Sequence, residues 1–229
     1  MSLTFARAEN VIVEKTAPTA MAVARLLTTE KWSVRVDEML KQSSASETGG
    51  DAWNPKSPAW HQAKSSIFSR ITQIIDSYAT SGELEKSLSQ DLAARLTPED
   101  ASSIAELLGG PAGASVLRFE ATTLFVSMAM AGDPNSPASG QPGWIDQMRQ
   151  VRAVFESKIG PDVPPGDPAQ GKVLKNYTKS PARQAFMNSL SEAVGKAVTS
   201  IDGSIQLDLF DAGDEIEDLI QEAVTQGNR

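Results

Sequence analysis

The pattern of apolar and polar positions is clearest along residues 96–131, which predict a helix, a tight corner and a second, very apolar helix. The first helix is expected to begin after Thr97, whose hydroxyl can cap it, with Pro98 in its first turn. Gly109 and Gly110 are expected to end it, since glycine takes the left-handed cap conformation without a Cβ penalty. The rest of the chain is predicted to pack around this helical hairpin.

The second helix of the hairpin is apolar on two opposite sides when residues are placed 100° apart. A helix of this kind is usually buried between two layers, so we expect it to be the buried central helix. Its charges and the limited length of the run argue against a membrane span, which needs about 20 mostly apolar residues. The two apolar faces carry Leu117, Ala121, Leu124 and Met128, and Phe119, Val126 and Met130; the polar stripes between them carry Ser115, Arg118 and Thr122, and Glu120, Thr123 and Ser127.

Apolar residues recur at helical spacing through most of the remaining chain, and no repeat of fixed period indicates a solenoid. We therefore predict an all-α fold, an irregular bundle of eight or nine helices around the central one. Thr28–Thr29 is expected to interrupt one helical region and Asp202–Ser204 to turn the chain. The predicted helices lie at about 17–27, 30–40, 58–80, 83–95, 97–108, 111–131, 144–159, 180–201 and 212–225.

A stretch rich in proline and glycine, residues 132–143, is the best internal boundary. Before it, residues 1–16 are expected to be a loosely structured lead-in and residues 17–131 a helical core. After it, the helices of 144–229 are expected to pack on that core, because a buried helix needs cover on both sides. Two helical subdomains joined by 132–143 are the alternative.

The charge is concentrated at the C-terminal end. The chain has a net charge of −8, and from Asp202 onward eight acidic residues and one basic residue give a net of −7. The remaining body is therefore close to neutral. Nucleic acids and anionic membranes select a basic face, so neither is predicted as a partner.

Residues 96–100, LTPED, and 107–113, LLGGPAG, form a helix start, an apolar segment and a short proline–glycine turn. In this pattern the chain resembles the bacterial domain of unknown function 2059 family, small exported helical proteins, over roughly residues 17–131. The family usually has an aromatic pair and a serine before the proline, where this chain has leucines and a glycine. The resemblance implies export and helices, and it implies no catalytic residues.

The chain begins Met-Ser-Leu and lacks the basic and apolar segments of a signal peptide. If these residues replace a removed signal segment, as the resemblance favours, the protein is periplasmic or secreted. The alternative is a cytoplasmic protein.

Few residues offer chemistry. There is no cysteine, which excludes disulfides, thiol nucleophiles and cysteine-based zinc sites, and there is one histidine, His61. No glycine-rich phosphate loop is present. We therefore predict no catalytic set, no metal site and no cofactor. His61 and its neighbour Trp60 are a candidate for ligand binding, with core packing of Trp60 and exposure of His61 as the alternative.

Arg118 and Glu120 are two residues apart on a helix, so they cannot pair with each other. Each needs its own partner if buried, because an unpaired buried charge is costly. They form either structural ion pairs or a polar ligand site in which Arg118 binds an anionic group. One basic cluster is either an anion-binding site or a solvated face that pairs with the acidic tail. It comprises Lys172, Lys175, Lys179 and Arg183.

Three functional hypotheses follow. The first is a non-enzymatic helical protein of the bacterial cell envelope that acts through contacts with a protein partner. The second is a helical module that binds a small molecule or lipid between helices near Arg118 or Trp60. The third is a hydrolase that uses His61 or a carboxylate such as Glu120.

Overall fold

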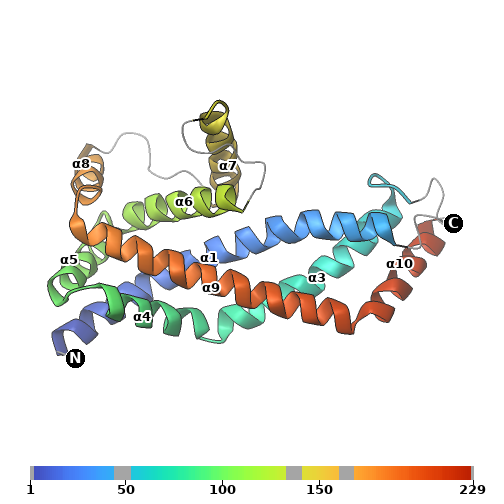
Figure 1. Ribbon diagram of the computed structural model, residues 1–229, viewed down its shortest axis with the longest axis horizontal. Helices are drawn as coiled ribbons and strands as arrows, with labels where there is room; N and C mark the ends of the chain where they lie inside the picture. The colour runs from blue at the N-terminus through green and yellow to red at the C-terminus, as the bar shows by residue number, and fades with distance from the viewer. Residues whose placement is uncertain (1–2, 44–52, 133–140, 160–167, 228–229) are drawn as a thin grey trace. The chain divides into compact units, whose positions relative to one another are not determined.

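The computed structural model describes residues 3–43, 53–132, 141–159 and 168–227. These residues form nine α-helices and no strand (Figure 1), so the predicted all-α fold is confirmed. The helices are α1 (Leu3–Gln42), α3 (Pro58–Thr80), α4 (Glu83–Arg95), α5 (Pro98–Gly109), α6 (Gly113–Ala131), α7 (Trp144–Ile159), α8 (Pro168–Tyr177), α9 (Pro181–Asp211) and α10 (Gly213–Gly227).

The contacts divide the helices into two compact units. Unit 1 comprises Met1–Leu27 and Gly82–Ala197, and unit 2 comprises Thr28–Ser81 and Val198–Arg229. Two of the three boundaries fall inside long helices, α1 and α9, and the third falls between α3 and α4. They do not fall at the predicted boundary 132–143, most of which lies outside the described residues. Each unit is therefore assembled from segments far apart in the sequence.

The long helix α1 corrects two predictions. The lead-in expected at 1–16 is helical from Leu3, and both Phe5 and Ile12 are buried, two turns apart. The break expected at Thr28 does not occur, because that side chain is fully buried and its packing overrides the weak helical preference of threonine.

The second long helix, α9, continues through residues 202–204, so the turn expected there is wrong. Ile201 and Ile205 are fully buried on either side of it and extend one apolar stripe. Asp202 accepts a hydrogen bond from the Nε1 of Trp32 at 2.9 Å. A residue typical of turns therefore anchors this helix within unit 2.

Local sequence signals act as expected at the start of α5 but not at its end. The Oγ1 of Thr97 accepts a hydrogen bond from the backbone N–H of Asp100 at 3.1 Å, which is the predicted cap. The predicted left-handed end is wrong, because Gly110 has φ −85° and an extended backbone. Gly110 precedes Pro111, and the proline ring confines the residue before it to extended conformations.

The helix α6 packs against α5, α7 and α8 within unit 1, and about half of it is buried. Its buried positions differ from those expected. Ser115, Glu120 and Thr122, from the predicted polar stripes, are buried, whereas Phe119 and Val126 are only half-buried. The buried face of α6 therefore includes polar side chains that need partners inside unit 1.

In unit 2, α10 packs along α3 (Figure 1). The helix α3 buries most of its predicted apolar stripe, including Trp60 and Ile71. The ring of Trp60 lies 5.2 Å from that of Trp53, whose Nε1 donates a hydrogen bond to the Leu40 carbonyl at 3.0 Å. This aromatic pair closes the start of α3 against the end of α1.

Candidate functional site

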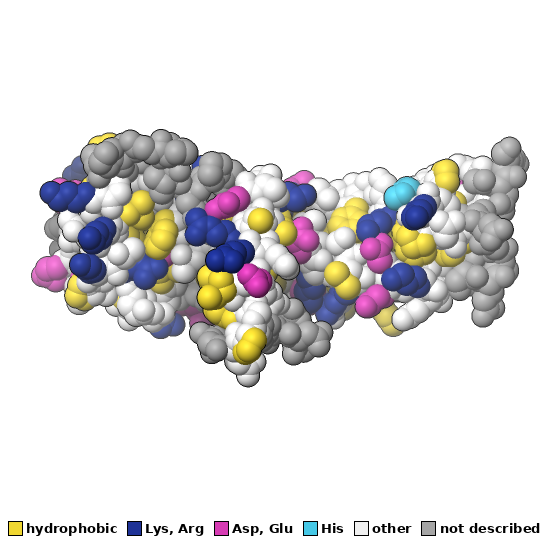
Figure 2. Space-filling model, turned by 90° about the horizontal axis from the view of Figure 1, so that it is seen from above, with side chains coloured by type: hydrophobic (Ala, Val, Ile, Leu, Met, Phe, Trp, Pro, Cys, Tyr) yellow, Lys and Arg dark blue, Asp and Glu magenta, His cyan; other side chains and the backbone are white. Residues whose placement is uncertain are grey.

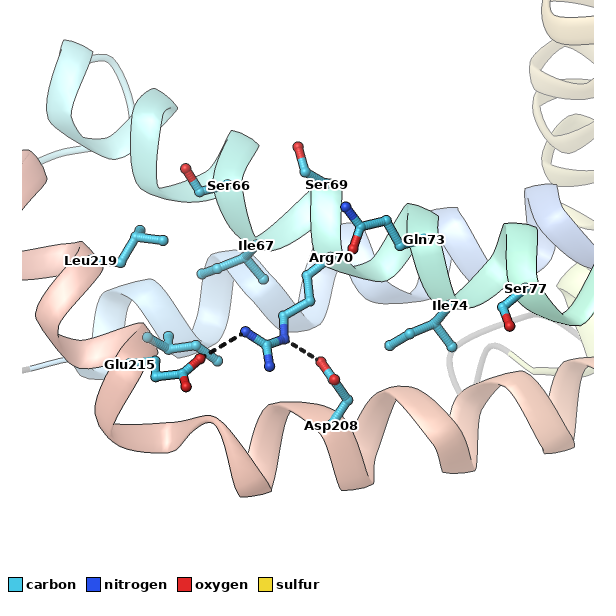
Figure 3. Close-up of a pocket in the computed structure, with 11 residues that line it drawn as sticks. Ser66, Ile67, Ser69, Arg70, Gln73, Ile74, Ser77, Asp208, Glu215 and Leu219 are labelled. Atoms are coloured by element: carbon cyan, nitrogen blue, oxygen red, sulfur yellow. Dashed lines mark hydrogen bonds and ion pairs between the residues drawn. The ribbon is translucent and has the colours of Figure 1, made fainter.

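Unit 2 has a groove of about 610 Å³ between α3 and the α9–α10 segment (Figure 3). The amphipathic character of α3 and α10 explains it, since both helices turn apolar residues toward each other and polar residues toward the opening. Four apolar side chains line it, of which Ile67 and Ile216 are buried. The full lining is Ser66, Ile67, Ser69, Arg70, Gln73, Ile74, Ser77, Asp208, Glu215, Ile216 and Leu219, which we call the unit 2 groove.

Arg70 crosses this groove and holds two carboxylates (Figure 3). Its Nε lies 2.5 Å from Oδ2 of Asp208, at the end of α9, and its Nη1 lies 3.1 Å from Oε2 of Glu215, at the start of α10. The hydrogen bond to Asp208, and then the one to Glu215, raise the pKa of the Arg70 guanidinium. One positive charge faces two negative ones, so the three groups together carry a net charge of −1.

The hydroxyl groups of Ser66 and Ser69, which line the groove on α3, remain able to accept hydrogen bonds. The hydroxyl of Ser66 donates to the Gln62 carbonyl at 3.1 Å, and that of Ser69 donates to the Ser65 carbonyl at 3.0 Å. A hydroxyl that has used its proton still offers acceptor lone pairs. The groove therefore combines an apolar floor, hydrogen-bond acceptors and excess negative charge, which is an arrangement for binding.

The structure brings together two predicted site residues that the sequence placed in separate sites. Arg183 Nε lies 2.5 Å from Oε1 of Glu120, and its Nη2 lies 2.9 Å from Oε2. This bidentate geometry is the strong form of a charge-assisted pair. Glu120 is fully buried, and its hydrogen bonds raise the pKa of Arg183. Arg183 therefore pairs with α6 of unit 1 and not with the acidic tail.

Tyr177, between the basic cluster residues, joins the surroundings of this pair. It is 6% exposed, and its hydroxyl makes no hydrogen bond of normal geometry within the described part of the chain. Burial, and then the nearby Glu120 carboxylate, raise the pKa of its phenol. The Arg183–Glu120 pair therefore joins α9 to α6 within unit 1.

The other predicted residues do not form a common site. Lys172, Lys175 and Lys179 are all exposed, while Arg118 is half-buried and has an interaction of its own. His61 is exposed and has no side-chain partner within the described residues, and Figure 2 shows the single histidine at the surface. Trp60 is buried against Trp53, as its core-packing interpretation predicts.

Sequence reasoning missed Arg70 and its two carboxylate partners. The available signal was a lone arginine among serine and glutamine on the outer side of a strongly amphipathic helix. Its partners lie 138 and 145 residues further along the chain. No pattern of local spacing connects residues so far apart.

In residues 3–43, 53–132, 141–159 and 168–227 no group of histidine, aspartate and glutamate side chains is arranged to hold a metal ion. By length and composition alone α6 could cross a membrane, but 50% of its apolar window is buried inside unit 1. Core helices of globular proteins share these properties, so this is weak evidence for a span.

Comparison with known proteins adds no relative. No family model, no curated protein and no solved structure matches the chain. The resemblance to the domain of unknown function 2059 family therefore stays a prediction that rests on residues 96–113.

Proposed function

We propose that this protein is a non-enzymatic binding protein of the bacterial cell envelope and that a protein partner occupies the unit 2 groove. The observation that carries the proposal is the groove itself, which has an apolar floor, an acceptor-rich rim and an accessible ion-pair group. The side chain of Arg70 is 38% exposed, so a partner can reach it. The family resemblance supports the envelope assignment.

The chemistry of the groove favours recognition over catalysis. Catalysis by proton transfer uses a general acid or base held near its reacting partner. His61 has no such partner within the described residues, and Glu120 is fully buried in its pair with Arg183. Arg70 stays protonated, because hydrogen bonds to two carboxylates raise its pKa further.

A small molecule or lipid is the second candidate occupant. Ligand pockets are typically about 300–1,000 Å³, and the groove, at about 610 Å³, lies within this range. An extended protein segment is favoured because hydrogen-bonding groups from Ser66 to Ser77 follow three turns of α3 along the groove.

Site-specific photo-crosslinking tests the proposal. A benzoylphenylalanine at Ser69, an exposed residue that lines the groove, is irradiated in an envelope extract, and the same residue at Ser103, exposed on α5 in unit 1, is the matched control. We expect a discrete protein adduct at the first position only. Excess wild-type protein should compete for it, whereas excess Gln73→Trp, in which the indole fills the groove, should not.

Two results would contradict the proposal. Equal adducts at Ser69 and Ser103, or no adduct at Ser69, would show that the groove holds no specific partner. An adduct with a small molecule or lipid at Ser69 would replace the protein partner by the second candidate.

A further inference from the structure

The junction of α9 and α10 exposes two large apolar side chains one helical turn apart. Phe210 is 85% exposed and Leu207 is 67% exposed, the two highest values among the large hydrophobic residues described. Single exposed apolar residues are common on protein surfaces. Two neighbours exposed to this extent on one helix face call for an explanation.

These two side chains lie on a different surface from the unit 2 groove. Asp208 faces that groove, while Leu209 lines a second one of about 430 Å³ beside the end of α1. Successive residues on a helix are 100° apart. With the directions of Asp208 and Leu209 thus occupied, Leu207 and Phe210 point away from both grooves.

Three carboxylates that follow the apolar pair in the sequence are also exposed: Asp211 at the end of α9, and Asp214 and Asp218 on α10. No residue described in the structure pairs with any of them. Asp214 lies in the first turn of α10, where the helix dipole favours a negative charge. Asp211 lies at the C-terminal end of α9, where the dipole disfavours one, and the last turn of that helix has no basic residue.

The remaining spacing is also unfavourable, since Asp214 and Asp218 are four residues apart on one helix and repel each other. The helix dipole therefore favours the carboxylate of Asp214, but neither the dipole nor the spacing along the helix favours those of Asp211 and Asp218. Cationic groups from outside the chain would relieve the repulsion at all three positions, and an apolar group beside them would cover Leu207 and Phe210.

We propose that this outer face, formed by Leu207, Phe210, Asp211, Asp214 and Asp218, binds a cationic amphipathic helix of a partner protein. The apolar side of the partner helix covers Leu207 and Phe210, and its lysine or arginine side chains meet the three carboxylates. The net charge of −7 from Asp202 onward attracts such a helix. This surface is independent of the groove, so the inference stands apart from the proposed function.

Other occupants fit less well. An anionic membrane would be repelled by the carboxylates. A second copy of this chain offers exposed lysines on and after α8, but the apolar Leu174 and Tyr177 of that segment are buried and cannot cover Phe210. A cationic helix whose apolar side is free supplies both contacts.

Fluorescence anisotropy on the full chain tests the inference with a labelled synthetic amphipathic helix of leucine and lysine. A peptide of the same composition, scrambled so that the leucines share no face, controls for bulk charge attraction. We expect the amphipathic peptide to bind about tenfold more tightly than the scrambled one, because apolar anchors dominate such interfaces. Equal binding of the two peptides would overturn the proposal.

Variants locate the binding. The double variant Leu207→Ala with Phe210→Ala, which truncates the apolar pair, should weaken binding of the amphipathic peptide by about tenfold. The triple variant Asp211→Asn, Asp214→Asn and Asp218→Asn should weaken binding similarly and reduce its salt dependence. Two controls should leave binding unchanged: Glu85→Gln, Glu99→Gln and Glu106→Gln, which neutralise three exposed carboxylates of unit 1, and Gln73→Trp, which fills the groove.

Three outcomes would contradict the proposal that this outer face binds a cationic amphipathic helix. Equal weakening by the two sets of carboxylate variants would show non-specific attraction. Unchanged binding in Phe210→Ala would show that the apolar pair is not the anchor. Sedimentation that shows wild-type self-association, lost in Phe210→Ala, would assign the surface to a second copy instead. The altered side chains are exposed, so each variant should still unfold cooperatively, which confirms that it is folded.

Discussion

Each unit contains an arginine–carboxylate group, and the two groups differ in their exposure to solvent. In unit 1, Arg183 makes a bidentate pair with a carboxylate that is fully buried. In unit 2, Arg70 joins two carboxylates at the open side of a groove, where its own side chain is 38% exposed. The same chemistry is thus enclosed in one unit and accessible in the other.

The contribution of each group to the free energy of unfolding depends on its exposure to solvent. Water screens exposed ion pairs, which contribute about 0–1 kcal/mol at most sites. Removing one partner of a buried pair leaves an uncompensated charge and costs far more. Glu120 and Arg183 are therefore expected to stabilise unit 1 more than Arg70 and its partners stabilise unit 2, and recognition is the role that we propose for Arg70.

The largest effect is expected from Arg183→Ala. It leaves Glu120 buried without its partner, so the free energy of unfolding should fall by about 3 kcal/mol, the low end for such pairs because Arg183 is 23% exposed. Urea denaturation measures this loss. The double variant Glu120→Met with Arg183→Met is the control and should recover most of the stability. A loss below about 1 kcal/mol, the range of surface pairs, would show that the buried pair stabilises unit 1 no more than an exposed pair does.

The next largest loss of stability is expected from a substitution of Gly113, at the tight corner where α6 begins. A Cβ on Gly113 would lie 2.1 Å from the carbonyl oxygen of Leu108, whereas one on Gly109 would meet nothing within 4 Å. Gly113→Ala should therefore cost about 2 kcal/mol or more, because overpacking forces the backbone to move. Gly109→Ala, the matched control, should be neutral or slightly stabilising. Equal unfolding midpoints for the two variants would show that the corner is not tightly packed.

A smaller effect should appear at alkaline pH. Burial and Glu120 raise the pKa of Tyr177 above its ordinary value of 10.0. The unfolded chain therefore loses this proton first, and the stability that neutral Tyr177 provides is present below pH 10 and lost as the pH rises further. Tyr177→Phe should reduce the fall in unfolding free energy above pH 10, measured by denaturation across that range. An identical reduction in Tyr78→Phe, whose ring is half-buried, would remove Tyr177 as the cause.

The smallest change in stability is expected from Arg70→Ala. Its ion pairs are exposed, so the unfolding midpoint should move much less than in Arg183→Ala. Arg70→Lys, which keeps the charge but not the two-sided geometry, is the conservative control. A midpoint shift in Arg70→Ala as large as that in Arg183→Ala would make the unit 2 group structural, and the difference between the units would vanish.

Several features of the fold were predictable because they depend on neighbours in the sequence. The cap of Thr97 on α5 follows from one side chain and the backbone three residues later. The need of Glu120 for a partner follows from the cost of burying a charge. Helical spacing predicted the helix at 58–80, which the structure has as α3. Each of these arguments uses only local geometry.

The remaining features depend on contacts that spacing cannot show. The partner of Glu120 lies 63 residues away, and Asp208 lies 138 residues from Arg70. Thr28 and Asp202 look like a break and a turn, yet packing and hydrogen bonds inside unit 2 keep both within long helices. The candidate site was missed for the same reason, since Arg70 on one side and Asp208 on the other are 138 residues apart in the sequence.

The most direct test measures Arg70→Ala and Arg183→Ala together, with the crosslinker at Ser69, for unfolding free energy and for the protein adduct. We expect Arg70→Ala to lose most of the adduct and to keep its stability. We expect Arg183→Ala to lose stability but, while still folded, to form the adduct as well as the parent protein does. A full adduct in Arg70→Ala, or a loss of stability equal to that of Arg183→Ala, would contradict the claim that unit 2 holds its arginine for recognition.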